Sequence, residues 1–71
     1  MYIVVELQTN GDQTANIVTA HATRNEADSK YHQVLAAAAI SNVELHACAL
    51  LTSEGYCIAN DHYTHTQEAE A

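Results

Sequence analysis

The side chains best suited to bind a ligand gather around the start of one predicted helix. The chain has only two permanent cations, Arg24 and Lys30, and both lie at or within the first two turns of that helix. A helix N-terminus presents free N–H groups and a partial positive charge, which together favour an anion. The rings of Tyr31 and His32 directly follow Lys30 and could stack on a base or hydrogen-bond a ribose. The pattern predicts a site for a small anionic ligand of nucleotide type.

The same cations also allow a purely structural interpretation. Glu26 and Asp28 lie in the first turn of the helix, where they could pair with Arg24 and Lys30 and partly cancel the positive field. Exposed ion pairs of this kind contribute little to stability. Both interpretations stay open at this point. His46, on a later strand, joins the candidate ligand set because its ring could form a further hydrogen bond.

The remaining reactive residues do not form a metal or catalytic pattern. The chain has five histidines and two cysteines, but it lacks a CxxC pair and a helical HxxxH pair, the spacings typical of zinc ligands. His46 and Cys48 point to one face of a strand, and His62 and His65 lie three residues apart. The serines, Ser41 included, lack a glycine-flanked nucleophile elbow. The sequence therefore predicts no metal site, no cofactor and no enzymatic activity.

The charge balance limits the classes of partner. Nine acidic residues against two basic ones give a formal net charge of −7 in 71 residues. Such a chain has no basic stripe with which to bind nucleic acid, and its acids are scattered singly, which argues against mimicry of nucleic acid. The apolar run near Met1 is too short for a signal peptide or a membrane span. We therefore expect no membrane association and a cytoplasmic protein with Cys48 and Cys57 reduced.

Short strands flank the helix on both sides. The β-branched and alternating segments predict four of them: Tyr2–Gln8, Asn16–Thr23, Val43–Thr52 and Tyr56–Tyr63. Asn10-Gly11 and Gly55 supply the turns of two hairpins. This order predicts an α+β fold, ββαββ, in which one helix covers one face of a four-stranded antiparallel sheet. We expect a single domain over residues 1–64 and a disordered acidic tail over residues 65–71.

The helix itself is predicted over residues 25–41, with Asn25 as its N-cap and Asn42 as the left-handed residue that ends it. One stripe at helical spacing should pack on the sheet, and it contains Ala27, Tyr31, Val34, Leu35 and Ala38. Further alanines and Ile40 carry apolar surface around to the opposite side. A helix that is apolar all round needs a second partner.

Two apolar surfaces thus lack a cover within the chain. The first is the back of the helix at Ala36 and Ile40. The second is the sheet face away from the helix, which we expect to carry Tyr2, Val4, Ile17, His46, Cys48 and Leu50. A chain of this length buries too little apolar surface to form a large core. Exposed apolar faces usually form protein interfaces or line ligand-binding sites. The sequence predicts a homo-oligomer whose interface includes Tyr2, Val4, Ala36, Ile40, Cys48 and Leu50.

Three segments carry a family resemblance: YIVVELQT at residues 2–9, SKYHQVLAAAA at residues 29–39 and HACALLTSEG at residues 46–55. Together they cover most of the chain and resemble the pattern ELQT…SKYHxVLAAAA…HAxxLxTxEG of short proteins encoded by phages and prophages of gut Gram-positive bacteria. The resemblance implies a viral accessory protein expressed in the host cytoplasm and implies no particular activity. By context, small oligomeric phage proteins often act against host defence.

Two hypotheses of different class follow. In the first, a homo-oligomeric anti-defence protein sequesters a nucleotide-type immune signal: Arg24 and Lys30 pair with phosphates, Tyr31 stacks, and His32 and His46 donate hydrogen bonds. In the second, an acidic interaction module binds and inhibits a host protein directly, through its acidic surface or its open sheet face. A structural phage accessory without a ligand is a further alternative.

Overall fold

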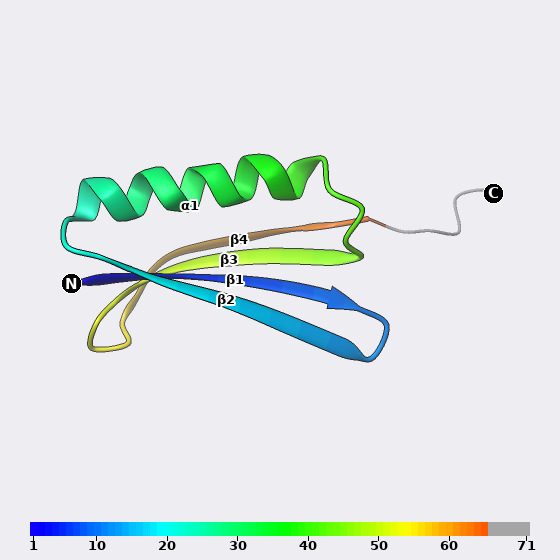
Figure 1. Ribbon diagram of the computed structural model, residues 1–71, viewed down its shortest axis with the longest axis horizontal. Coiled ribbons are helices and arrows are strands. Elements are labelled where there is room, and N and C mark those ends of the chain that lie inside the picture. Colours follow the sequence, from blue (N-terminus) through cyan, green and yellow to red (C-terminus); the bar gives the residue numbers. More distant parts are fainter. Residues whose placement is uncertain (66–71) are drawn as a thin grey trace.

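The computed structural model describes residues 1–65, which form four strands and one helix in the order ββαββ. The elements are β1 (Tyr2–Asn10), β2 (Gln13–His21), α1 (Arg24–Ala39), β3 (Leu45–Thr52) and β4 (Cys57–Thr64). All strand pairs are antiparallel, and the sheet order is β2-β1-β3-β4. The helix forms a second layer on one face of the sheet (Figure 1). The predicted α+β fold, with two hairpins joined by one helix, is confirmed.

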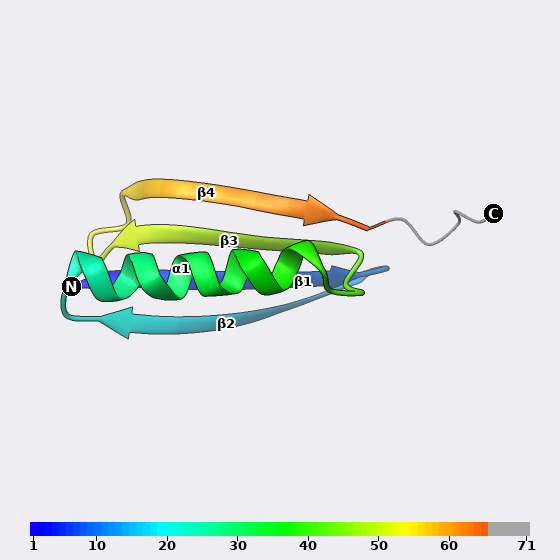
Figure 2. The ribbon, with the colours of Figure 1, turned by 90° about the horizontal axis from the view of Figure 1, so that it is seen from above.

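The helix runs along the strands rather than across them. Figure 2 shows α1 lying over the two central strands, β1 and β3, with β2 and β4 to either side. The outer strands are therefore the less covered ones, and most of β2 is exposed. Strand β4 forms one edge of the sheet, and β2 forms the other.

The first hairpin is tighter than the sequence suggests. Its two central turn residues are Gly11 and Asp12, and the register runs unbroken from the Asn10–Gln13 pair at the turn to the Tyr2–His21 pair. Gly11 has a φ of 60°, which fits the first central position of a type II′ turn, where glycine is favoured. The turn is also tied to the segment before β3: Gly11 N donates to Glu44 Oε1 at 2.8 Å, and Glu44 N donates to Asn10 Oδ1 at 3.0 Å.

Both ends of the helix differ from the prediction. The N-cap is Thr23, not Asn25: Thr23 has an extended backbone, and its hydroxyl accepts from Glu26 N at 3.2 Å. At the other end, no non-glycine residue among residues 1–65 has a positive φ, so the prediction of a left-handed Asn42 is wrong. Ile40 and Ser41 follow the helix. The Ser41 side chain caps the helix end, as described below.

The small core lies between the helix stripe and the central strands. The prediction of the stripe is confirmed, since Ala27, Tyr31, Val34 and Ala38 are buried and Leu35 is half-buried. Ala27, Tyr31, Val34 and Leu35 pack on Val4 of β1 and on Cys48 and Leu50 of β3. The outward residues of the helix are exposed as expected, including Ala36 and Ile40, the latter 86% exposed.

The two faces of the sheet are exchanged relative to the prediction. The prediction places Val4, Cys48 and Leu50 on the uncovered face and at an interface, but they lie beneath α1 and are 1–2% exposed. Tyr2 is half-buried against the same core. The alternation predicted for β1, β2 and β3 is confirmed, but both residue sets of the central strands contain apolar residues, so the pattern does not show which set the helix covers. The uncovered face instead carries Ile3, Val5, Leu7, Val18, Leu45, Ala47, Ala49 and Leu51.

His65 lies one residue beyond the predicted domain boundary and forms two hydrogen bonds. Its backbone N–H donates to Glu44 O at 2.8 Å, and its ring Nε2 donates to Ala38 O at 2.8 Å. The rest of the predicted tail, residues 66–71, lies outside the residues that the structure describes.

Candidate functional site

The predicted ligand residues do not converge on one site. Arg24 is the first residue of α1, whereas His46 lies beside the C-terminal end of that helix, where Ser41 contacts it. A helix of 16 residues is about 24 Å long at 1.5 Å per residue. One small ligand cannot contact both ends of such a helix within a single chain.

Two of the five residues are also buried. Tyr31 is 7% exposed and belongs to the core, and its ring lies edge-on to the exposed His32 with 5.5 Å between centroids. Burial, with a smaller contribution from Asp61, raises the pKa of the Tyr31 phenol. His46 is 3% exposed. Neither buried ring offers an open face on which a base could stack.

The two cations near the helix start, Arg24 and Lys30, have different surroundings. Arg24 Nε lies 3.3 Å from Asp28 Oδ1 in an exposed i,i+4 pair, the contact that the structural interpretation anticipates and one worth little energetically. Lys30 is half-buried, and its charge is near enough to help lower the pKa of Glu6. The structure thus brings Lys30 toward the sheet, and it leaves Arg24 at the surface.

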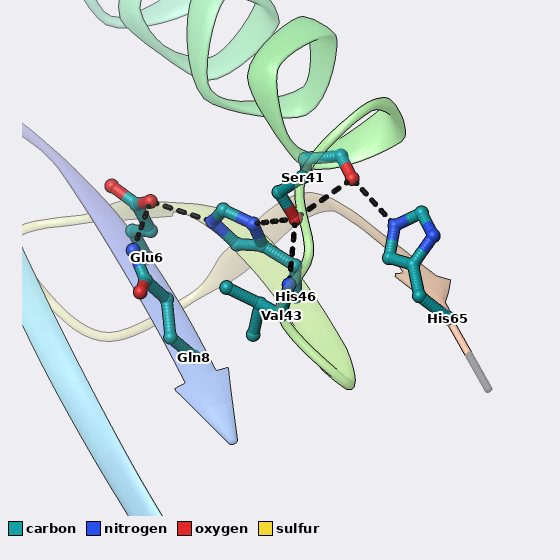
Figure 3. Close-up of polar contacts among 7 residues, drawn as sticks. Glu6, Gln8, Ser41, Val43, His46 and His65 are labelled. Carbon is teal, nitrogen blue, oxygen red and sulfur yellow. Dashed lines mark hydrogen bonds and ion pairs between the residues drawn. The ribbon is translucent and has the colours of Figure 1, made fainter. Parts of the chain in front are cut away.

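The polar cluster that the structure does assemble consists of Glu6, His46 and Ser41 (Figure 3). His46 Nε2 lies 2.6 Å from Glu6 Oε2, and His46 Nδ1 lies 3.0 Å from Ser41 Oγ. Strand β1 positions Glu6 and its neighbour β3 positions His46, while Ser41 follows the end of α1. The three residues connect both central strands to the helix terminus.

The charge on Glu6 determines how the cluster is protonated. Burial alone would raise the pKa of the Glu6 carboxyl, but the hydrogen bonds from His46 and from Gln8, at 2.9 Å, outweigh it and lower that pKa below its ordinary value. Glu6 is therefore a carboxylate at neutral pH and can only accept. It follows that His46 carries a proton on Nε2, which it donates to Glu6.

Two proton arrangements are compatible with the remaining contacts. With His46 neutral, Nδ1 accepts from the Ser41 hydroxyl; with His46 cationic, Nδ1–H donates to Ser41 Oγ, and the hydroxyl proton turns to Ala38 O at 3.3 Å. In both cases Val43 N–H donates to Ser41 Oγ at 3.3 Å. The serine hydroxyl thus links the following loop to the sheet in both arrangements, and it also bonds the helix carbonyl of Ala38 when His46 is cationic.

These groups are the ones that serine hydrolases use, a serine, a histidine and a carboxylate. Here the histidine is almost completely buried and the serine oxygen is held by Ala38, Val43 and His46. A hydroxyl held in this way acts as a cap, and the buried network specifies how the helix packs on the sheet. The sequence pattern did not identify this cluster because Glu6 lies 40 residues from His46; its one signal was an acidic residue within the otherwise apolar run YIVVEL.

A second feature of functional interest is the uncovered sheet face. The charged residues among residues 1–65 lie on α1, in turns and loops, or, for Glu6 and Asp61, on the helix side of the sheet. Within the described chain, the uncovered face therefore carries no Asp, Glu, Lys or Arg. A hollow of about 310 Å³ opens there, lined mainly by Leu7, Leu45, Ala47, Ala49, Asn60 and His62.

The two cysteines occupy different environments and are both free thiols. Cys48 is buried beneath α1, where burial, reinforced by the Glu6 carboxylate, raises the pKa of its thiol to about 11. Cys57 is exposed on β4, and its Sγ accepts from Asn60 Nδ2 at 3.4 Å. Neither thiol has the electropositive surroundings of a reactive cysteine.

Comparison with protein-family models, with curated proteins and with solved structures gave no match for the chain. Among residues 1–65, no three His, Cys, Asp or Glu side chains are grouped so that they could hold a metal ion. Over the same residues, no helix is both long and apolar enough to cross a bilayer.

Proposed function

We propose that this protein acts by binding rather than by catalysis, as a homo-oligomer whose subunits pack their uncovered sheet faces together. The observation that carries the proposal is the segregation of charge. The chain has a net charge of −7, yet the uncovered face bears apolar and neutral polar side chains. Depletion of charged residues is the compositional signal of an interface core.

The size of this face is adequate for such a contact. Four strands about 4.8 Å apart and eight residues of about 3.3 Å each cover roughly 500 Å² per subunit. Two subunits would bury roughly 1,000 Å², the lower limit expected for a specific interface. The pairing would be a two-fold sheet-on-sheet packing, which gives the single sheet the second layer that its uncovered face lacks.

A second copy also fits the electrostatics of the molecule. Seven described acids lie away from the uncovered face, so two faces can meet without bringing like charges together: Glu6, Asp12, Glu26, Asp28, Glu44, Glu54 and Asp61. The exterior of the oligomer would then be strongly acidic. This arrangement favours the interaction module over nucleotide capture, because Arg24 and His46 lie at opposite ends of α1 and Tyr31 and His46 are buried.

The acidic exterior is the surface left for a partner. On the phage resemblance described above, that partner would be a host protein with a basic surface. If such a protein is purified and titrated, its affinity should fall when NaCl is raised from 50 to 300 mM, because exposed charges are screened. An affinity that does not change with salt would contradict binding through the acidic surface.

The face contact can be tested by one substitution and a matched control. Leu7→Lys places a charge at the centre of the uncovered face, whereas Ser29→Lys adds the same charge at an exposed position of α1. Size-exclusion chromatography with light scattering should give a multiple of 7.7 kDa for the wild type and Ser29→Lys, and a smaller species for Leu7→Lys. A wild type that is monomeric at 100 µM, or an unchanged mass for Leu7→Lys, would overturn the proposal.

A fluorophosphonate probe tests whether the protein acts as a serine hydrolase. Ser41 is the one serine hydrogen-bonded to His46, so hydrolase chemistry would make it react with a fluorophosphonate probe. We expect no labelling of the native protein. Labelling that disappears in Ser41→Ala would refute a function by binding alone.

A further inference from the structure

The outer edge of β2 lacks every device that normally protects a sheet edge. Exposed edges are usually blocked by a charge, a proline, a bulge or a covering element. The strand sequence QTANIVTAH has no charged residue and no proline, its register with β1 is unbroken, and its residues are mostly exposed. The opposite edge, β4, carries Asp61 and pairs with β3 through a register shift at Leu50/Leu51.

The hairpin turn identifies which backbone groups of β2 point outward. The type II′ turn makes Asn10 and Gln13 a hydrogen-bonded pair, and such pairs alternate with non-hydrogen-bonded ones along an antiparallel ladder. Counting from the turn with the observed register, the N–H and C=O groups that face away from β1 belong to Thr14, Asn16, Val18 and Ala20.

We propose that this edge pairs with the same edge of a second copy, β2 antiparallel to β2, to form a continuous eight-stranded sheet. This contact is distinct from the face-to-face contact proposed above. The four residues whose backbone groups point outward are placed symmetrically about Ile17. A two-fold axis at Ile17 therefore pairs Asn16 with Val18 of the other copy, and Thr14 with Ala20 of the other copy. Every outward N–H then meets a C=O, which is what an isologous contact requires.

The side chains at the axis support a second copy as the occupant. Ile17 is 48% exposed in the single chain, and at the axis it would meet its own equivalent at the short distance of a non-hydrogen-bonded pair. The same register places the turn residue Asp12 opposite Ala22 of the other copy, two residues before Arg24, which pairs with Asp28 within its own chain.

Both helices would lie on the same side of the joined sheet, and both uncovered faces on the other. The charge-free surface would therefore double in width. Face-to-face packing of two such dimers would close a tetramer of four 7.7 kDa chains.

The edge contact is tested through the backbone. Asn16→Pro removes an outward N–H without removing a bond to β1, as proline is tolerated at such edge positions, whereas Asn16→Ala keeps that N–H. Light scattering should show half the wild-type mass for Asn16→Pro and the wild-type mass for Asn16→Ala. Ile17→Lys, which opposes two ammonium groups at the axis, should also halve the mass. Circular dichroism confirms that each variant is folded.

Amide hydrogen exchange separates this contact from the face contact. In the wild type, the amides of Thr14, Asn16, Val18 and Ala20 should exchange at least tenfold more slowly than in Ile17→Lys, and they should stay protected in Leu7→Lys. Fast exchange of these amides in the wild-type oligomer would overturn the edge pairing and leave the face contact standing. An unchanged mass for both Asn16→Pro and Ile17→Lys would also overturn it.

Discussion

His46 Nε2 lies 2.6 Å from Glu6 Oε2, although 40 residues separate the two in the chain. The contact joins the central strands β1 and β3 beneath the end of α1, and Ser41 continues it to the helix terminus at 3.0 Å. The core has few buried side chains, and this polar chain ties the end of the helix to the sheet in addition to the apolar packing.

The Glu6 carboxylate should make stability depend on acid pH. A carboxyl whose pKa is lower in the folded than in the unfolded state stabilises the fold above its unfolded pKa, and that stabilisation is lost as the pH falls through the folded value. For Glu6 the loss begins near the ordinary value of 4.5 and continues below it. Melting by circular dichroism at pH 6 and pH 3 should show a smaller change in Tm for Glu6→Gln than for the wild type. Identical pH profiles would contradict this role of Glu6.

Ser41→Ala should destabilise the fold by about 1–2 kcal/mol, since it leaves His46 Nδ1 and Val43 N–H without their partner. For a domain of this size, each kcal/mol corresponds to a fall in Tm of roughly 4–8 °C. Ser29→Ala, at an exposed helix position, is the matched control and should leave Tm unchanged or slightly raised, because alanine favours helix. If both variants melt alike, Ser41 does not cap the helix.

The two thiols should differ in reactivity. At pH 8, iodoacetamide should modify Cys57 within minutes and leave Cys48 unmodified, because Cys48 is buried and its thiol pKa is about 11. Intact mass spectrometry would show one adduct on the native protein and two in guanidinium chloride. Cys57→Ser should show none in the native state. An adduct on native Cys48 would mean that α1 separates from the sheet often enough to expose the Cys48 thiol.

The back of the helix is the remaining candidate interface. Ile40 is 86% exposed, and the sequence predicts that it contacts another copy. If the sheet face and the β2 edge are the contacts, Ile40→Glu should leave the mass in light scattering unchanged. A smaller species for Ile40→Glu, combined with an unchanged mass for Leu7→Lys, would place the interface on the helix.

The sequence by itself determined the elements and their order. The stripe from Ala27 to Ala38 has helical spacing, the strands alternate, and Gly11 and Gly55 mark the two hairpin turns, all of which are local properties of the chain. Even the apolar surplus on the sheet and on the helix back can be read from these periods, because period and composition do not depend on what lies opposite in space.

Only the tertiary structure decided which strand faces meet the helix and which polar residues meet each other. Val4, Cys48 and Leu50 form an apolar set, but so do Ile3, Val5 and Leu51, and a period of two cannot rank two apolar faces. The sheet order that places β1 beside β3 is what brings Glu6 to His46, and the short exit through Ser41 completes the contact. The pair of Glu6 and His46 cannot be predicted from the sequence, because the two residues are far apart in the chain. The energy of a buried hydrogen bond depends on the partner that the fold places beside it.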